Sequence, residues 1–151
     1  MIEWQVLGTY LGRSVFVAEE AGNDLRRIET YLPGTLLMAY FSSPSFEGVH
    51  LKNLVRALLD AEPLGLLLSG SGAKKAFDSA IDILSESEHR PQILTKYLAE
   101  EDLKEVAQDF LWASWPSEDR IDDWTDYRVL VFGAGCFSQV SDSIGELCDN
   151  D

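Results

Sequence analysis

Two glycine-rich turns follow apolar runs of the chain and contain the residue types that bind anionic ligands. One turn occupies residues 69–72, after the apolar run 64–68, and the other occupies residues 133–136, after the apolar run 127–132. A turn that opens a helix leaves backbone N–H groups without intrahelical partners, so it attracts phosphates and carboxylates. These turns supply one set of candidate ligand-binding residues: Ser69, Gly70, Ser71, Gly72, Gly133, Gly135 and Cys136.

Neither turn satisfies a phosphate-binding motif. Gly65 and Gly70 have the spacing of the two glycines of a P-loop, but the Lys and the Ser or Thr that must follow are absent. The dinucleotide pattern fails at its third glycine, where the two turns have Lys75 and Ser138. We therefore interpret the first turn as structural. Binding of a nucleotide or another small molecule, by an α/β enzyme or sensor, is the alternative hypothesis.

Cys136 is the residue of these turns with nucleophilic chemistry, because a helix N-terminus can lower the pKa of a thiol. A catalytic cysteine also needs a base, and neither His50 nor His89 is near it in the sequence. We interpret Cys136 as a small packed side chain and expect no catalytic residue. The cysteines and histidines lack zinc spacing, and residues 119–126 lack the glycine and final Glu of a calcium loop. We expect no metal and no cofactor.

The most unusual stretch is residues 109–127, which contains three of the four tryptophans among many acidic residues. Aromatic rings supply contact area in protein interfaces, and carboxylates attract a basic surface. A run of charges is more often a solvated face whose tryptophans pack inward. The two interpretations coexist if one tryptophan packs while another is exposed. The predicted partner-binding residues are Trp112, Trp115, Glu118, Asp119, Asp122, Asp123, Trp124 and Asp126.

The acidity belongs to the second half of the chain. The sequence has 12 Lys and Arg against 26 Asp and Glu, a formal net charge of −14. Residues 1–76 contribute −1 of this charge, and residues 77–151 contribute −13. Such a charge repels nucleic-acid phosphates and anionic membranes. We expect a basic protein partner, no nucleic acid and no membrane, and the oligomeric state stays open.

The elements that position these residues follow from the apolar periodicity. Apolar runs predict strands at residues 35–41, 64–68, 93–98 and 127–132, and each run precedes a stretch with helical spacing. The first helical stripe is Leu51, Leu54, Val55, Leu58 and Leu59, and the second is Ala73, Ala76, Phe77, Ala80, Ile81 and Leu84. This alternation predicts a three-layer α/β sandwich with a mostly parallel central sheet of about 5–6 strands.

The ends of the chain complete the predicted fold. Residues 2–6 and 14–18 predict two strands with a turn near residues 11–13, which form an N-terminal antiparallel edge or hairpin. Thr95 and Lys96 predict that the strand at residues 93–98 is an edge strand or occupies a partly exposed position. Asn23-Asp24 and Ser43-Pro44 are capping signals for two helices.

Right-handed crossovers between parallel strands gather the turns at residues 42–45, 69–72, 98–102 and 133–136 at one edge of the sheet. Glu100, Glu101 and Asp102 then bring three carboxylates to that edge. Negative charge weakens the binding of an anion unless a metal intervenes. The better functional prediction is therefore the acidic stretch that follows.

The length of 151 residues fits a single α/β domain that covers residues 1–151. The sequence has no secretion signal and no apolar run long enough for a bilayer, so we expect a cytoplasmic protein. The leading hypothesis is a small acidic binding protein without catalytic activity, similar in size and charge to immunity or antitoxin proteins that block a basic toxin. An oligomeric scaffold is a third hypothesis.

Overall fold

The computed structural model describes residues 3–20, 32–41, 48–86, 93–98, 102–113, 116, 118–132 and 136–148. Two of its short helices are not α-helical: η1 (Asp109–Ala113) is a π-helix and η2 (Glu118–Asp123) is a 3₁₀-helix. The order of elements is β1 (Gln5–Tyr10), β2 (Arg13–Glu20), β3 (Thr35–Phe41), α1 (Gly48–Asp60), β4 (Gly65–Gly70), α2 (Ala73–Glu86), β5 (Leu94–Leu98), α3 (Leu103–Gln108), η1 (Asp109–Ala113), η2 (Glu118–Asp123), β6 (Asp126–Phe132) and α4 (Phe137–Gly145). The four predicted strand–helix units are confirmed.

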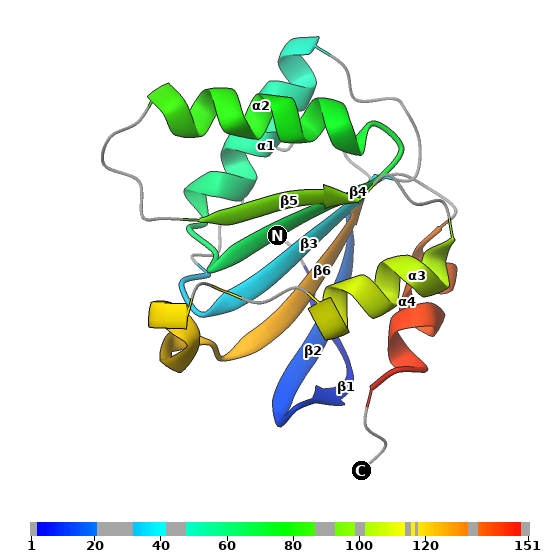
Figure 1. Ribbon diagram of the computed structural model, residues 1–151. Coiled ribbons are helices and arrows are strands. Elements are labelled where there is room, and N and C mark those ends of the chain that lie inside the picture. The colour runs from blue at the N-terminus through cyan, green and yellow to red at the C-terminus, as the bar shows by residue number, and fades with distance from the viewer. Residues whose placement is uncertain are drawn as a thin grey trace.

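The strands form one six-stranded mixed sheet in the order β1-β2-β6-β3-β4-β5 (Figure 1). β1 and β2 pair antiparallel, and every other neighbouring pair is parallel. The α/β fold and its N-terminal hairpin are confirmed, and β5 is an edge strand as predicted. Because β2 to β6 run in the same direction, we call the side where they begin the amino edge and the side where they end the carboxyl edge.

Alternate residues of the strands divide the core into two apolar clusters. On one face, Leu37 and Leu130 pack with α1 and α2, and on the other face, Leu36 and Val129 pack with α3, η1 and α4. Helices therefore cover both faces of the sheet (Figure 1). Strands buried on both faces read as continuous apolar runs, which is why residues 35–41 and 127–132 were recognisable.

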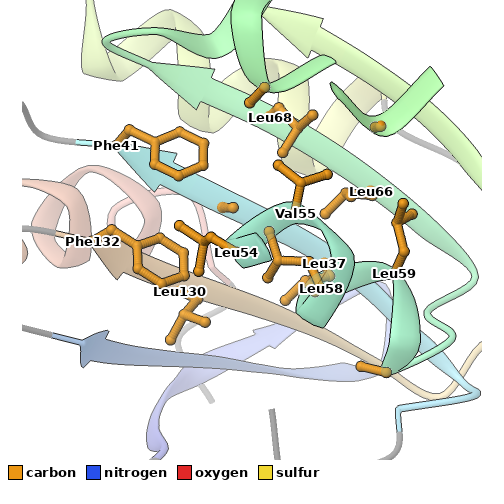
Figure 2. Close-up of a cluster of buried hydrophobic side chains, with 14 of the residues drawn as sticks. Leu37, Phe41, Leu54, Val55, Leu58, Leu59, Leu66, Leu68, Leu130 and Phe132 are labelled. Carbon is orange, nitrogen blue, oxygen red and sulfur yellow. The ribbon is translucent and has the colours of Figure 1, made fainter. Parts of the chain in front are cut away.

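Helix α1 buries all five residues of its predicted stripe, each at most 4% exposed: Leu51, Leu54, Val55, Leu58 and Leu59. Figure 2 shows several of them above the sheet, beside the rings of Phe41 and Phe132. Those rings stack with their centroids 5.4 Å apart. Each such burial contributes roughly 1.5–3 kcal/mol to stability, so this face fixes the pairing of β3 with β6.

The predicted strand at residues 2–6 is shifted, because β1 spans Gln5–Tyr10 and includes Gly8. Pairing with β2 outweighs the low strand propensity of glycine, and the register shift between Val6 and Gly8 absorbs the irregularity. Trp4 lies just before the strand and packs against the core on the α1 side. The β1–β2 pair and its turn are as predicted.

The predicted stripe of α2 is wrong at two positions. Ile81 is 45% exposed, whereas Ile83, which the stripe omits, is buried. Helix α2 packs on α1 as well as on β4 and β5, so its apolar face turns toward α1. A stripe drawn for contact with the sheet alone misses this rotation.

Some predictions fall outside the described residues: the helix capped at residues 23–24, the cap at residues 43–44, and Glu100 and Glu101. Asp102 is described, and its carboxylate accepts a hydrogen bond from the Lys104 N–H at 3.0 Å as the N-cap of α3. None of the helices in the described part of the chain is long and apolar enough to cross a membrane.

Candidate functional site

The first glycine-rich turn is shorter than predicted, because β4 continues through Ser69 and Gly70. The Ser69 side chain is buried, and its hydroxyl donates a hydrogen bond to the Ala39 carbonyl oxygen at 3.3 Å. The Ser71 N–H donates to the Phe41 carbonyl oxygen at 2.8 Å. These donors join β4 to β3, so they are already used within the protein.

Glycine is required at the two positions of this turn for partly different structural reasons. Gly70 and Gly72 have positive φ angles of 85° and 77°, a region that favours glycine. A Cβ atom on Gly70 would also collide with the Phe41 carbonyl oxygen, whereas a Cβ on Gly72 would meet nothing within 4 Å. Both glycines are explained by the backbone, which supports the structural interpretation of the turn.

Cys136 precedes α4 at the carboxyl edge and packs, partly buried, against the cluster on the α3 and α4 side. Burial, and secondarily the charge of Cys136, raise the pKa of the nearby Tyr40 hydroxyl. His50 is exposed on α1, and no hydrogen bond joins it to Cys136 in the described structure. Gly133, Gly135 and His89 lie outside the described residues.

A cavity of about 460 Å³ lies at the opposite side of the sheet, the amino edge, where β3 and β6 begin. Its size is within the range of small-ligand sites. Its lining combines two arginines, two aspartates and two threonines with a short loop before β3: Leu32, Pro33, Gly34, Thr35, Arg120, Asp123, Thr125, Asp126 and Arg128. The described residues of the first turn therefore lie at the carboxyl edge, whereas Asp123 and Asp126 lie at the amino edge.

Asp126 connects the strands that form this cavity. Its carboxylate accepts a hydrogen bond from the Thr35 hydroxyl at 2.5 Å and pairs with the Arg128 guanidinium at 3.3 Å. The side chains of this ion pair are only 15% and 18% exposed. Low exposure strengthens such a contact. Asp126 therefore stabilises the fold and does not present its carboxylate fully to a partner, although it was predicted to bind one.

Arg128 lies between two aromatic rings. Its guanidinium carbon is 5.0 Å from the ring centroid of Trp4 and 4.5 Å from that of Phe16. Cation–π contacts of this kind contribute roughly 0.5–2 kcal/mol each. The Arg128 Nε and the Trp4 Nε1 are both buried without a hydrogen-bond partner among the protein atoms. Arg128 is thus held in place by stacking and by Asp126.

Tyr127 anchors the acidic segment on the other face of β6. Its ring contacts Phe110 of η1, Trp124 after η2, and Tyr10 of β1, with centroids 5.6, 5.1 and 6.1 Å away. Burial raises the pKa of Tyr127 to about 12, with Arg13 opposing this effect and Tyr10 adding to it. The residues on both sides of the acidic stretch are therefore fixed to the same buried ring.

Trp124 is a structural anchor, since its side chain is only 5% exposed. Its indole N–H donates to the Asp126 carbonyl oxygen at 3.2 Å, and the Arg13 guanidinium lies 4.1 Å from its ring centroid. The Arg13 Nε also donates to the Trp124 carbonyl oxygen at 3.2 Å. Because interface residues need accessible area, Trp124 does not serve as an exposed contact.

The other predicted partner-binding residues are mostly at the surface. Trp112 is 50% exposed on η1, and Trp115 lies outside the described residues. Four carboxylates are exposed on the single helix η2: Glu118, Asp119, Asp122 and Asp123. One tryptophan of the stretch packs inward and another is exposed, and the binding of a partner by this stretch stays a prediction.

Sequence reasoning missed Thr35, Arg128 and Arg13, which organise the cavity and the buried tryptophan. Arg128 did carry a signal, because it interrupts the otherwise apolar run of β6. A charged residue in a central strand needs a partner, and that partner is Asp126, two residues earlier on the same strand. Thr35 and Arg13 become recognisable only when β3, β2 and β6 are placed side by side.

The described residues contain no group of three or more His, Cys, Asp or Glu side chains placed to hold a metal ion. No protein-family model matches the chain, and no curated protein matches its sequence. The residues at the amino edge therefore supply the evidence for the function of this protein.

Proposed function

We propose that this protein is a small binding protein without catalytic activity that uses the acidic amino edge of its sheet to engage a basic protein surface. The observation that carries the proposal is the exposure of Glu118, Asp119, Asp122 and Asp123 on one short helix. Carboxylates grouped in this way steer a basic partner, and the binding of a basic surface relieves the repulsion between them.

The helix is held on a rigid support, which favours binding over a merely solvated loop. Trp124 follows η2 directly and is buried against Tyr127. The Thr125 N–H and hydroxyl both donate to the Gly34 carbonyl oxygen, at 2.7 and 3.0 Å. A surface whose backbone is already ordered loses less conformational entropy when a partner binds.

The cavity beside η2 gives the acidic surface a concave region. Asp123 belongs to both the helix and the cavity lining, and Arg120 and Arg128 also line it. A partner that inserts a basic side chain near Asp123 must tolerate these two arginines. The site therefore favours a partner with mixed charges around a basic centre, and such a pattern supplies specificity. An immunity or antitoxin protein that blocks a basic toxin, such as a nuclease, has this chemistry by analogy of size and charge.

A small-molecule site at the carboxyl edge has less support. The Ser69 hydroxyl and the Ser71 N–H are used between β3 and β4. Asp102, one of the described acids at that edge, carries a negative charge that disfavours anions. This alternative still predicts a thermal shift with nucleotides or cofactors that the acidic-edge proposal does not.

The test measures binding to basic proteins encoded by neighbouring genes, by titration calorimetry of the purified chain. The triple substitution Asp119→Asn, Asp122→Asn and Asp123→Asn removes three charges and should weaken binding at least about tenfold. The control Asp82→Asn, Asp142→Asn and Glu146→Gln removes three exposed charges elsewhere. It should leave the affinity within about twofold of the wild type, apart from long-range effects that salt screens.

If both triple variants bind every such partner as tightly as the wild type, the acidic edge is not the binding surface. Equal weakening by the two variants would also contradict the proposal, because it would assign the effect to net charge alone. Both variants must keep the wild-type melting temperature for the comparison to count, and all substituted side chains are exposed.

A further inference from the structure

Four of the six exposed large hydrophobic side chains of the described structure lie on β5 or on the helices beside it, and the other two, Val6 and Leu11, lie at β1 and its turn. Leu94 and Tyr97 of β5 are 47% and 38% exposed, Ile81 of α2 is 45% exposed, and Trp112 of η1 is 50% exposed. Helix α2 packs on β5, and η1 contacts β5 through the Lys96 side chain. The ring of Phe77, one turn before Ile81, lies 4.9 Å from the Tyr97 ring. Apolar side chains therefore flank β5 on both faces of the sheet.

The outer side of β5 pairs with no strand in the described part of the chain, because β4 is its neighbour on the other side (Figure 1). A strand of five residues leaves a row of backbone N–H and C=O groups along this side. Such a row recognises one chemical class, an extended polypeptide that adds a strand. The backbone supplies affinity, and alternate side chains supply specificity.

Proteins usually protect an open edge with a charged residue, and Lys96 is the one charge on β5. Its ammonium group is tied instead to the Asp109 carboxylate at 2.8 Å and reaches the Ala113 carbonyl oxygen at 3.5 Å. Lys96 is thereby turned toward η1 and placed beside the segment that carries Trp112. The charged residue that would normally protect this edge instead holds η1, which carries the exposed Trp112, next to β5.

The opposite edge of the sheet is protected in a different way. β1 has a register shift between Val6 and Gly8, and such a bulge prevents the regular pairing of another strand. The β4–β5 ladder has no such shift from Leu94 to Leu98. The two edges are thus unequal, and β5 is the one suited to pairing.

We propose that β5 is a docking edge for an extended, basic segment of a partner protein, in which apolar side chains alternate with lysine or arginine. The apolar side chains, all on one face of the added strand, would contact Tyr97 and Ile81, and the aliphatic stems of the lysine or arginine side chains on the other face would cover Leu94 and Trp112. The preference for positive charge rests on the function proposed above and on the −14 charge of the chain. That charge also disfavours a second copy of this chain as the occupant.

The test uses a synthetic peptide of about eight alternating lysine and valine residues, which is long enough to span a strand. Binding is measured by titration calorimetry, and the paired strand is located by hydrogen exchange of the amides of residues 94–98. Tyr97→Lys and Leu94→Lys place a charge at the edge and should weaken binding at least about tenfold. Val6→Lys adds the same charge at an exposed apolar residue of the opposite edge, and binding should stay within about twofold.

Peptide binding should slow exchange of amides in β5, and a peptide with proline at its centre should bind at least about tenfold more weakly because it lacks one N–H donor. Equal weakening by Tyr97→Lys and Val6→Lys, or binding without slower exchange in β5, would overturn the proposal. A dimer of this chain that Tyr97→Lys dissociates would also overturn it, since a second copy would then be the occupant.

The proposal that the η2 carboxylates bind a basic partner can be wrong while docking of a peptide at β5 is correct. Loss of peptide binding in the Asp119, Asp122 and Asp123 triple variant, with no effect of the β5 variants, supports the acidic edge and contradicts β5 docking. The reverse pattern supports β5 docking and contradicts the acidic edge as the peptide site.

Discussion

Replacement of Tyr127 by phenylalanine is expected to stabilise the protein. The side chain is fully buried, and its hydroxyl has no hydrogen-bond partner among the protein atoms. Burial of an unsatisfied polar group costs roughly 1–3 kcal/mol. Tyr127→Phe removes that group and keeps the ring contacts with Phe110, Trp124 and Tyr10. We expect the free energy of unfolding at pH 7 to rise by about 1 kcal/mol.

The difference should grow at alkaline pH. The pKa of Tyr127 is raised to about 12 in the folded protein from 10.0 in the unfolded chain. Between these values the unfolded chain loses the proton first, so the wild type loses stability as the pH rises above 10. At pH 11 this loss amounts to about 1.4 kcal/mol. Tyr127→Phe has no such proton to lose, so its advantage should widen by that amount.

Urea denaturation followed by far-ultraviolet circular dichroism at pH 7, 9, 10 and 11 measures both effects. Tyr97→Phe is the control for removal of a hydroxyl, because its ring is exposed, and it should change the free energy of unfolding at pH 7 by less than about 0.5 kcal/mol. A loss of more than about 1 kcal/mol in Tyr127→Phe at pH 7 would refute the reasoning, because the hydroxyl would then have a stabilising partner. A constant difference from pH 9 to pH 11 would refute the effect of burial on the pKa.

Two further predictions compare matched positions. Gly70→Ala should destabilise the protein by about 3 kcal/mol or more and Gly72→Ala by only about 1 kcal/mol. Both glycines have positive φ, but only the new Cβ at Gly70 meets the Phe41 carbonyl oxygen, and equal urea midpoints would contradict this. Trp124→Ala should cost about 3–5 kcal/mol, and Trp112→Ala should cost less than about 1 kcal/mol. The first side chain is 5% exposed and the second 50%, and iodide should quench Trp112 fluorescence selectively in single-tryptophan variants.

Much of the fold could be predicted because local pattern and tertiary structure agree. Continuous apolar runs mark β3, β4 and β6 since helices cover both of their faces. The polar residues Thr95 and Lys96 mark β5 as an edge strand. The predictions failed where packing between helices decided the outcome, as at Ile81 and Ile83 of α2. They also failed at β1, where pairing with β2 carries the strand through a glycine.

The candidate site could be predicted only in part, because the sequence shows which residues are charged but not which way their side chains point. The acidic stretch at residues 109–127 was recognised from composition, and its carboxylates on η2 are exposed. The same composition could not show that Trp124 and Asp126 turn inward, since their partners Arg13 and Thr35 lie far from them in the sequence. Strand order alone brings these groups together.

The negative charge of the chain and the outer side of β5, which pairs with no described strand, both affect whether identical chains pair with one another. An apolar edge strand promotes pairing between identical chains, and β5 has no bulge to prevent it, while its one lysine is partly exposed and paired with Asp109. A net charge of −14 makes each copy repel the next. The same field attracts a basic segment, so charge can suppress self-pairing while it favours a different partner. An edge protected by charge alone is selective, because it excludes like chains and remains accessible to a strand of opposite charge.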